Sequence, residues 1–311
     1  MANEHRSGLA PDDYHKLTGF EGDWRDTWWD QDYLVFMAGQ LGLQGRRRAL
    51  DLGCGVGHWG QRLLPLMHPQ ATLVGIDAEA TWMERARERA DARGLQARYQ
   101  VANAAALPFE DDAFDLVTCQ TLLMHVADPE TVLTEARRVL APGGMMLAAE
   151  PNNVGSTAAH MVWEPRPDWS MMSALIELEY TLGRGKEALG EGWSSVGERL
   201  PAAMTRVGFQ RVDARLNNQC LPRIPPDYVH DRRSIEMLRE THANGAFFGP
   251  GGTYDNGLRQ FQAAGGSPAR FKELWAVAMA HQQRVLDAID AGTHASAGGH
   301  LHYLVWGVNA G

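Results

Sequence analysis

Short apolar runs alternate with amphipathic segments along most of this chain. Six runs have the length and pattern of strands: 48–53, 72–77, 97–102, 114–119, 145–150 and 210–216. A seventh run, 300–308, lies near the C-terminus. Strands separated by helical patterns are typical of a parallel sheet with helices on both faces. We therefore expect an α/β fold with a doubly wound, seven-stranded sheet.

The segments between these runs carry helix signals. Residues 58–67 and 79–93 follow helical periodicity, and Asp128 and Pro129 open a third helix as its cap and first turn. We expect the Pro-Gly-Gly triplet at 142–144 to end this third helix. Its apolar stripe comprises Val132, Leu133, Ala136, Val139 and Leu140.

Two segments lie outside this alternation. Residues 1–45 are rich in aromatic side chains, and 217–299 carry long helical patterns. We expect a helical cap over 1–45, a core over 46–216 plus 300–311, and a helical insert or lid over 217–299. Both extra segments are expected to cover the carboxyl ends of the strands, where open α/β sheets bind their ligands.

Composition narrows the classes of function. The 311 residues are 44% hydrophobic and carry a formal net charge of −9, which disfavours a nucleic-acid partner because phosphate contacts need a basic face. No apolar run is long enough to span a bilayer, and the first residues form no signal sequence. We therefore expect a cytoplasmic protein with no membrane span. The three separate cysteines are expected to be free buried thiols, and no metal site is expected.

A glycine-rich stretch, LDLGCGVGHWG at 50–60, has two interpretations. Gly55, Gly57 and Gly60 spell the G-x-G-x-x-G pattern of dinucleotide-binding loops. Asp51, followed by Gly53, Gly55 and Gly57, spells the D-x-G-x-G-x-G pattern of loops that bind S-adenosylmethionine. Both loops use glycines so that a ligand can approach the backbone at a helix N-terminus, so the glycines alone do not decide.

Three further features favour the methyl donor. A carboxylate at Asp51 can hold an ammonium group but is an odd neighbour for a pyrophosphate. The segments VANAAALPFEDDAFDLVTC (101–119) and ADPETVLTEARRVLAPGGMMLAAEP (127–151) follow in order. With the loop, they resemble the class I S-adenosylmethionine-dependent methyltransferases, most closely the small-molecule group that includes the quinone-biosynthesis type. The resemblance covers about 46–216 and implies a Rossmann-like sheet whose last strand is antiparallel.

The resemblance implies S-adenosylmethionine as the cofactor and a set of residues that bind it. This set comprises Asp51, Gly53, Gly55, Gly57, Asp77, Asn103, Ala104 and Gln120. Asp51 and the first glycines would hold the methionine end, with Gln120 beside it, and Asp77 would accept hydrogen bonds from the ribose. Asn103 and Ala104 would lie at the adenine edge. Asn103 stands where the family commonly has an acid, and its amide oxygen can still accept from the adenine amino group.

Two residues are candidates for catalysis. His125 follows the fourth strand, where this fold brings the acceptor near the methyl group. It could act as a base or polar contact, or be a partly buried histidine bonded to backbone. Glu150 ends the fifth strand at the same rim and could orient an acceptor or cap the following turn.

Aromatic residues of the first segment are candidates for acceptor binding. Trp28, Trp29 and Tyr33 could line a pocket for a lipophilic or aromatic acceptor, or form a cation–π cage. They belong to a cluster with Trp24 and Phe36, and spacings of three to five residues within this cluster favour a simpler interpretation for most of its members, namely the core of the N-terminal cap.

The sequence thus predicts in-line methyl transfer from S-adenosylmethionine to a small-molecule acceptor. The alternatives are a nicotinamide-dependent oxidoreductase, in which Asp51 would be dispensable, and a non-catalytic protein that binds S-adenosylmethionine. The methylated atom (carbon, oxygen or nitrogen), the use of a general base and the oligomeric state stay open.

Overall fold

The fold is taken from a computed structural model that describes residues 25, 28–160, 168–218, 220, 222–229, 232–247, 252–298 and 300–311. The predicted cap aromatics Tyr14, Phe20 and Trp24 lie outside the described residues. The chain divides into two compact units. The sheet unit comprises Arg25–Pro151, Val196–Asn218 and His302–Gly311, and the helical unit contains Asn152–Ser195 and Gln219–Leu301.

The sheet unit holds seven strands in the order β3-β2-β1-β4-β5-β7-β6. Their bounds are β1 Arg48–Leu52, β2 Thr72–Asp77, β3 Ala97–Val101, β4 Phe114–Gln120, β5 Leu140–Pro151, β6 Gln210–Leu216 and β7 His302–Val308. Strands β1 to β5 pair in parallel, and β7 is antiparallel to both β5 and β6. The predicted α/β sheet with an antiparallel last strand is confirmed.

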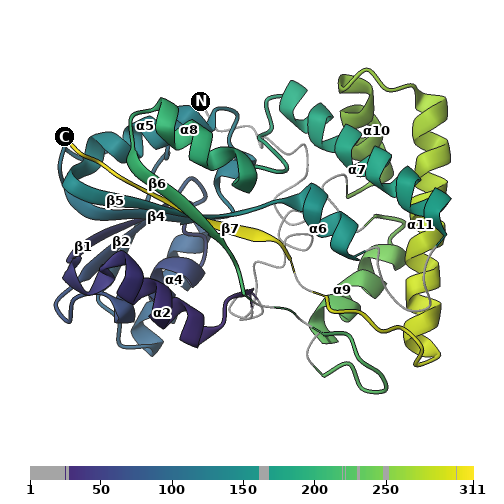
Figure 1. Cartoon of the computed structure of the whole chain (residues 1–311), viewed down its shortest axis with the longest axis horizontal. Coiled ribbons are helices and arrows are strands. Elements are labelled where there is room, and N and C mark those ends of the chain that lie inside the picture. Colours follow the sequence, from purple (N-terminus) through teal and green to yellow (C-terminus); the bar gives the residue numbers. More distant parts are fainter. Residues whose placement is uncertain are drawn as a thin grey trace. The chain divides into compact units, whose positions relative to one another are not determined.

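Helices cover both faces of this sheet. The helices of the sheet unit are α2 Gln31–Leu41, α3 His58–Leu63, α4 Thr81–Ala92, α5 Pro129–Val139 and α8 Leu200–Arg206. Helices α5 and α8 lie on one face, and α2 and α4 lie on the other (Figure 1). Short 3-10 turns include η3 Leu64–Leu66 and η4 Leu123–His125. The doubly wound arrangement buries the apolar residues on both sides of the central strands, and Leu50 and Val117 have no exposed surface.

Helix α5 forms where its sequence signals predict. Asp128 accepts a hydrogen bond from the backbone N–H of Glu130 at 3.0 Å, and Pro129 occupies the first turn. Four residues of the predicted stripe are fully buried on this helix. The fifth, Leu140, is buried as well but is the first residue of β5.

Strand β5 is longer at its start than the predicted run 145–150. The reason is a long-range pairing at the Pro-Gly-Gly triplet. The Gly143 N–H donates to the Asn309 carbonyl at 2.7 Å, and the Asn309 N–H donates to the Gly144 carbonyl at 2.8 Å. The residues after β7 therefore hold the triplet in an extended ladder, which local turn chemistry did not indicate.

The helical unit contains α6 Asn153–His160, α7 Trp169–Ala188, α9 Arg232–Ala243, α10 Tyr254–Ala263 and α11 Pro268–Asp290. Its core joins Leu178 and Leu182 of α7 to Phe261 of α10 and to Phe271 and Trp275 of α11. Helices α6 and α7, which follow β5, thus belong to the same unit as the helices of the predicted insert 217–299. The role of 217–299 as a lid stays a prediction.

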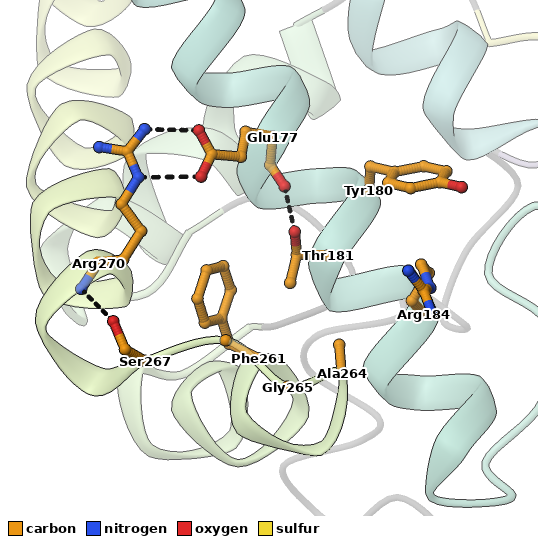
Figure 2. A pocket seen from close by; sticks show the side chains of 10 residues that line it. Glu177, Tyr180, Thr181, Arg184, Phe261, Ala264, Gly265, Ser267 and Arg270 are labelled. Carbon is orange, nitrogen blue, oxygen red and sulfur yellow. Dashed lines mark hydrogen bonds and ion pairs between the residues drawn. The ribbon is translucent and has the colours of Figure 1, made fainter.

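A polar hollow of about 470 Å³ opens between α7, α10 and α11 (Figure 2). One side is fixed by a bidentate ion pair, in which the Arg270 guanidinium donates to both oxygens of Glu177 at 2.9 and 2.5 Å. Tyr180 and Arg184 line the same hollow from α7. None of the sequence-predicted site residues lines it.

No helix in the described part of the chain is both long and apolar enough to cross a membrane. Cys54 and Cys119 are buried free thiols, as expected. Cys220 is exposed, so the expectation of burial was wrong for this residue, which lies just after β6 and outside the sheet.

Candidate cofactor site

The residues predicted to bind the cofactor gather at one edge of the sheet. Strands β2, β1, β4 and β5 are parallel neighbours, so their carboxyl ends meet there. The register places Leu52 of β1 between Ile76 of β2 and Cys119 of β4. The next residues, Gly53 after β1, Asp77 at the end of β2 and Gln120 at the end of β4, therefore lie at the same level of the sheet.

The glycine loop between β1 and α3 requires glycine for two reasons. Gly53 and Gly57 have φ of +59° and +82°, in the left-handed region that favours glycine. A Cβ on Gly53 would lie 2.6 Å from Leu122 Cδ1, and one on Gly57 would lie 2.4 Å from Gln61 Nε2. The loop is thus in close contact with the segment that follows β4.

Asp51 lies beneath this loop and is 1% exposed. Its Oδ2 accepts a hydrogen bond from the Gly60 N–H at 3.0 Å, which ties the carboxylate to the first turns of α3. Its Oδ1 is buried and has no hydrogen-bond partner among the described residues. Burial raises the pKa of Asp51 to about 7, because removal from water disfavours the charged form.

Asp77, the last residue of β2, ties the glycine loop to its own strand. Oδ2 accepts from the Gly55 N–H at 3.0 Å and Oδ1 accepts from the Glu79 N–H at 3.0 Å. Burial raises the pKa of Asp77, and the two backbone hydrogen bonds oppose this shift. Each oxygen retains a lone pair with which it can accept from a ligand hydroxyl.

Three further predicted residues lie near the ends of β3 and β4: Asn103 and Ala104 follow β3, and Gln120 is the last residue of β4. Asn103 is exposed, and its Oδ1 accepts from the Ala105 N–H at 2.9 Å, which folds residues 103–106 into a turn that includes Ala104. Gln120 is 8% exposed. Its Nε2 is buried with no hydrogen-bond partner among the described residues.

Glu150 is fully buried and holds the turn after β4. Its Oε1 accepts from the N–H groups of Leu122 at 2.8 Å and Leu123 at 2.9 Å, and the Cys119 thiol lies 3.5 Å away. Burial raises the pKa of Glu150 to about 7. These contacts are with the turn after β4 and not with the turn that follows β5, which the sequence interpretation had expected Glu150 to cap. A role in orienting an acceptor stays a prediction.

His125 lies in that turn, at the end of η4. Its side chain is half-buried, and its N–H donates to the Leu122 carbonyl at 2.8 Å. Leu123 anchors the turn with no exposed surface. Thr121 begins the turn with a φ of +51°, a strained value for a threonine that no sequence signal indicated.

The predicted acceptor-binding aromatics pack within the sheet unit. Trp29 is 2% exposed, and its ring centroid lies 5.4 Å from that of Trp59 on α3. Trp28 is 8% exposed and lies 4.7 Å from the ring of His302 at the start of β7. The Tyr33 hydroxyl donates to the Leu216 carbonyl at 2.8 Å.

Sequence reasoning missed two of the polar links behind this edge. The Trp59 indole donates to the Thr118 hydroxyl at 2.6 Å, and that hydroxyl donates to the Leu147 carbonyl at 2.6 Å. Arg138 of α5 binds the segment between β3 and β4. These residues carry no signal of long-range partners, because each was part of an ordinary strand or helix pattern.

Comparisons of the sequence and fold with known proteins identify methyltransferases as relatives. Residues 44–187 match the family described as a methyltransferase domain. The chain is 43% identical over 104 residues to demethylmenaquinone methyltransferase of Thermus thermophilus, which covers 33% of this chain and 47% of that protein. It is 30% identical over 177 residues to ubiquinone biosynthesis O-methyltransferase of Maricaulis maris, covering 50% of this chain and 67% of that protein.

The chain spans about half the length of the demethylmenaquinone methyltransferases that it matches. Among solved structures, phosphoethanolamine N-methyltransferase 2 of Haemonchus contortus, in complex with S-adenosyl-L-methionine, shares the fold. Its TM-score is 0.51 at 16% identity, over 98% of this chain and 61% of that one. The sheet order, the glycine loop and these matches lead to one conclusion: the chain belongs to the S-adenosylmethionine-dependent methyltransferase family.

Proposed function

We propose that this protein transfers a methyl group, in line, from S-adenosylmethionine to a small-molecule acceptor. One observation carries the proposal: the neighbouring strands β1 and β4 each hold a side chain with a buried polar atom that has no hydrogen-bond partner among the described residues. Asp51 Oδ1 is an acceptor and Gln120 Nε2 is a donor. Buried polar atoms are normally hydrogen-bonded, so each indicates a missing partner. The ammonium and carboxylate of a methionine moiety are chemically complementary to this pair.

The other predicted contacts fit the same cofactor. The glycine loop lets a ligand approach the backbone at the start of α3. Asp77 retains acceptor capacity on both oxygens for the two ribose hydroxyls. Asn103 and Ala104 lie in a turn after β3, at the next strand end along the sheet, where they would face the adenine edge.

Bound S-adenosylmethionine supplies a methyl group that is already activated on a sulfonium. The protein's own task is therefore to orient the acceptor and exclude water. His125, half-buried in the turn after β4, is the candidate to accept a proton if the acceptor loses one. Glu150 holds the backbone of that turn, so we assign it as a positioning residue for His125.

The relatives suggest which acceptor to test first. Two are named for menaquinone and ubiquinone biosynthesis, and a quinol ring is a lipophilic aromatic acceptor. Their matches cover 33% and 50% of this chain, so they support the cofactor domain more strongly than the acceptor. Tyr33, which is half-buried, is the aromatic candidate best placed for a ligand contact, and Trp28 and Trp29 would support it from the core.

The first experiment measures cofactor binding by calorimetry with S-adenosylhomocysteine and NAD in parallel. We expect S-adenosylhomocysteine to bind. The substitutions Asp51→Asn and Gln120→Leu should each lower the affinity for it. Binding of NAD alone, with Asp51→Asn without effect, would overturn the proposal in favour of the oxidoreductase alternative.

The second experiment measures transfer from methyl-tritiated S-adenosylmethionine to a demethylated quinol or to small molecules of a cell extract. Label in the organic or aqueous small-molecule fraction is expected, and His125→Ala should lower its rate. Label in precipitated protein or RNA would contradict a small-molecule acceptor. Tight cofactor binding without any transfer would favour the non-catalytic alternative.

A further inference from the structure

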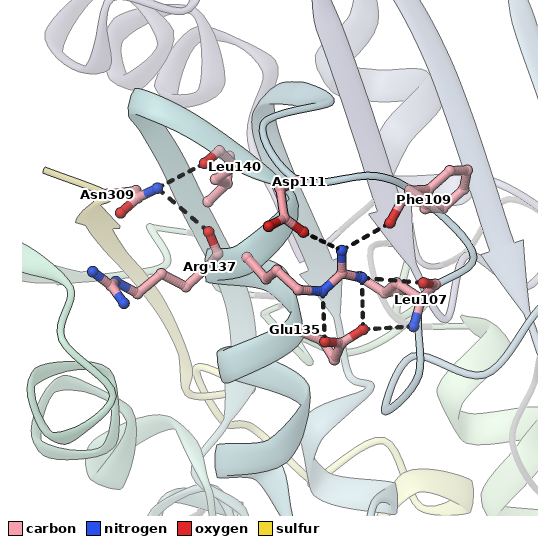
Figure 3. Close-up of polar contacts among 8 residues, drawn as sticks. Leu107, Phe109, Asp111, Glu135, Arg137, Leu140 and Asn309 are labelled. Carbon is pink, nitrogen blue, oxygen red and sulfur yellow. Dashed lines mark hydrogen bonds and ion pairs between the residues drawn. The ribbon is translucent and has the colours of Figure 1, made fainter. Parts of the chain in front are cut away.

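The segment between β3 and β4 contains the turn proposed to face adenine. Two side chains of α5, which forms no part of the predicted site, hydrogen-bond to this segment. Arg138, in the last turn of α5, has five N–H donors, and each has an acceptor. The acceptor residues Leu107, Phe109, Asp111 and Glu135 are labelled in Figure 3. Nε and Nη2 donate to Glu135 at 2.8 and 2.9 Å. Nη1 donates to the Phe109 carbonyl and to Asp111, both at 2.8 Å, and Nη2 also donates to the Leu107 carbonyl at 3.1 Å.

Glu135 provides a second hydrogen bond to the backbone of Leu107. Its Oε2 accepts the Leu107 N–H at 2.8 Å, so both backbone polar groups of Leu107 are bound to α5. The side chain of Leu107 is 6% exposed and so anchors the same point in the core. The guanidinium lowers the pKa of Glu135, which keeps this carboxylate charged.

Leu107, the first residue of the segment that α5 binds, directly follows the turn at 103–106. The turn itself has two local hydrogen bonds, from the Ala105 N–H to Asn103 Oδ1 and from the Ala106 N–H to the Asn103 carbonyl at 3.0 Å. Asn103 is exposed, so little packing holds its side chain. A fixed point at Leu107 therefore restricts how far the turn can depart from one geometry, which lowers the entropy lost when a ligand binds.

We propose that Arg138, together with Glu135, is a positioning residue for the nucleobase of the cofactor, holding the Asn103–Ala106 turn so that Asn103 can select the adenine amino group. This inference rests on the proposed function and deepens it. It assigns to α5, which forms no part of the predicted site, control over base selectivity.

The test uses Arg138→Lys, which keeps the charge and loses the planar fork. Arg206→Lys is the matched control, because Arg206 donates to Glu130 from Nε and Nη2 at 2.9 and 2.6 Å in a fork that binds no part of 103–111. Calorimetry compares S-adenosylhomocysteine with S-inosylhomocysteine, which has an oxygen in place of the adenine amino group.

We expect wild type to bind S-adenosylhomocysteine more tightly than the inosine analogue, and Arg138→Lys to weaken its affinity for S-adenosylhomocysteine about 10-fold, as for loss of the proposed hydrogen bond between Asn103 and the adenine amino group. The affinity of Arg138→Lys for the inosine analogue should fall less, and Arg206→Lys should change the affinity for neither ligand. In an Asn103→Ala background, Arg138→Lys should add little further loss of selectivity. A raised KM for S-adenosylmethionine with kcat nearly unchanged is expected in steady state.

Three results would each overturn this inference. They are an equal loss of affinity for both ligands in Arg138→Lys, affinities in Arg138→Lys that equal those of wild type, and losses of selectivity that add when Arg138→Lys is combined with Asn103→Ala. Absence of any S-adenosylhomocysteine binding by wild type would instead overturn the proposed function. If Arg138→Lys fails to fold by circular dichroism, Glu135→Gln, which keeps an acceptor for the Leu107 N–H, is judged by the same selectivity measurement.

Discussion

At the scale of single residues, the two carboxyl groups proposed to bind the cofactor also hold the backbone around the glycine loop. Asp51 and Asp77 each hold a backbone N–H of the glycine loop or of α3, so the loop is already shaped before a ligand arrives. A preshaped loop reduces the conformational cost of binding. The same contacts mean that substitutions here act on both affinity and stability.

Asp77→Ala removes the proposed ribose contacts. We expect the affinity for S-adenosylhomocysteine to fall about 10-fold, since two charge-assisted hydrogen bonds are lost, measured by calorimetry. The control is Asp115→Ala, because Asp115 also accepts backbone N–H groups, from Arg47 and Arg48, but at the start of β4. An affinity that falls equally in both variants would contradict the placement of Asp77.

The buried carboxyls Asp51 and Glu150 predict a pH dependence of stability. Burial raises both pKa values to about 7, whereas the unfolded chain releases these protons near pH 4. The folded chain therefore keeps protons on these two groups that the unfolded chain loses, and their contribution to stability falls as pH rises from about 4 to about 7. Each group should contribute on the order of 1 kcal/mol per pH unit in this window.

Urea unfolding between pH 5 and pH 8 measures this effect. Asp51→Asn and Glu150→Gln should each make the unfolding free energy less dependent on pH below 7, and the double variant should flatten it further. An unfolding free energy that depends on pH in the same way in wild type and in both variants would show that these groups are ionised in the folded chain.

At the scale of elements, the turn after β4 depends on one side chain from a neighbouring strand. Glu150→Leu leaves the Leu122 and Leu123 N–H groups without their acceptor, at a cost of about 1–3 kcal/mol for each buried donor. Glu150→Gln keeps an oxygen acceptor and should cost much less. Hydrogen exchange at these two amides should accelerate in the leucine variant and change little in the glutamine variant.

Transfer activity adds a second readout for the same element. If Glu150 positions the turn of His125, kcat should fall in Glu150→Leu and be largely retained in Glu150→Gln. Comparable loss of kcat in both variants would indicate that the carboxylate itself takes part in the chemistry.

At the scale of the whole molecule, every residue proposed to bind the cofactor belongs to the sheet unit. The helical unit has its own core, in which Phe271 has no exposed surface. Phe271→Ala should therefore lower stability by about 3–5 kcal/mol through the cavity it leaves, measured by thermal or urea unfolding. Below the unfolding transition, affinity for S-adenosylhomocysteine should stay within about twofold of wild type. A large loss of affinity would show that cofactor binding depends on the helical unit.

The sequence by itself determined the elements whose signals are local. Apolar runs of strand length marked the seven strands, and Asp128 with Pro129 marked the start of α5, because caps and periodicity act within a few residues. The glycine loop was recognisable for the same reason, since each left-handed glycine is a local requirement.

Only the tertiary structure decided the partners of these elements. The continuation of β5 back to Leu140 follows from pairing with Asn309, and the role of Glu150 follows from a turn 27 residues earlier in the chain. His302 at the start of β7 is 3% exposed and its ring lies 4.7 Å from that of Trp28. Such contacts join segments far apart in sequence, and the side chains that make them carry no local pattern that names their partner.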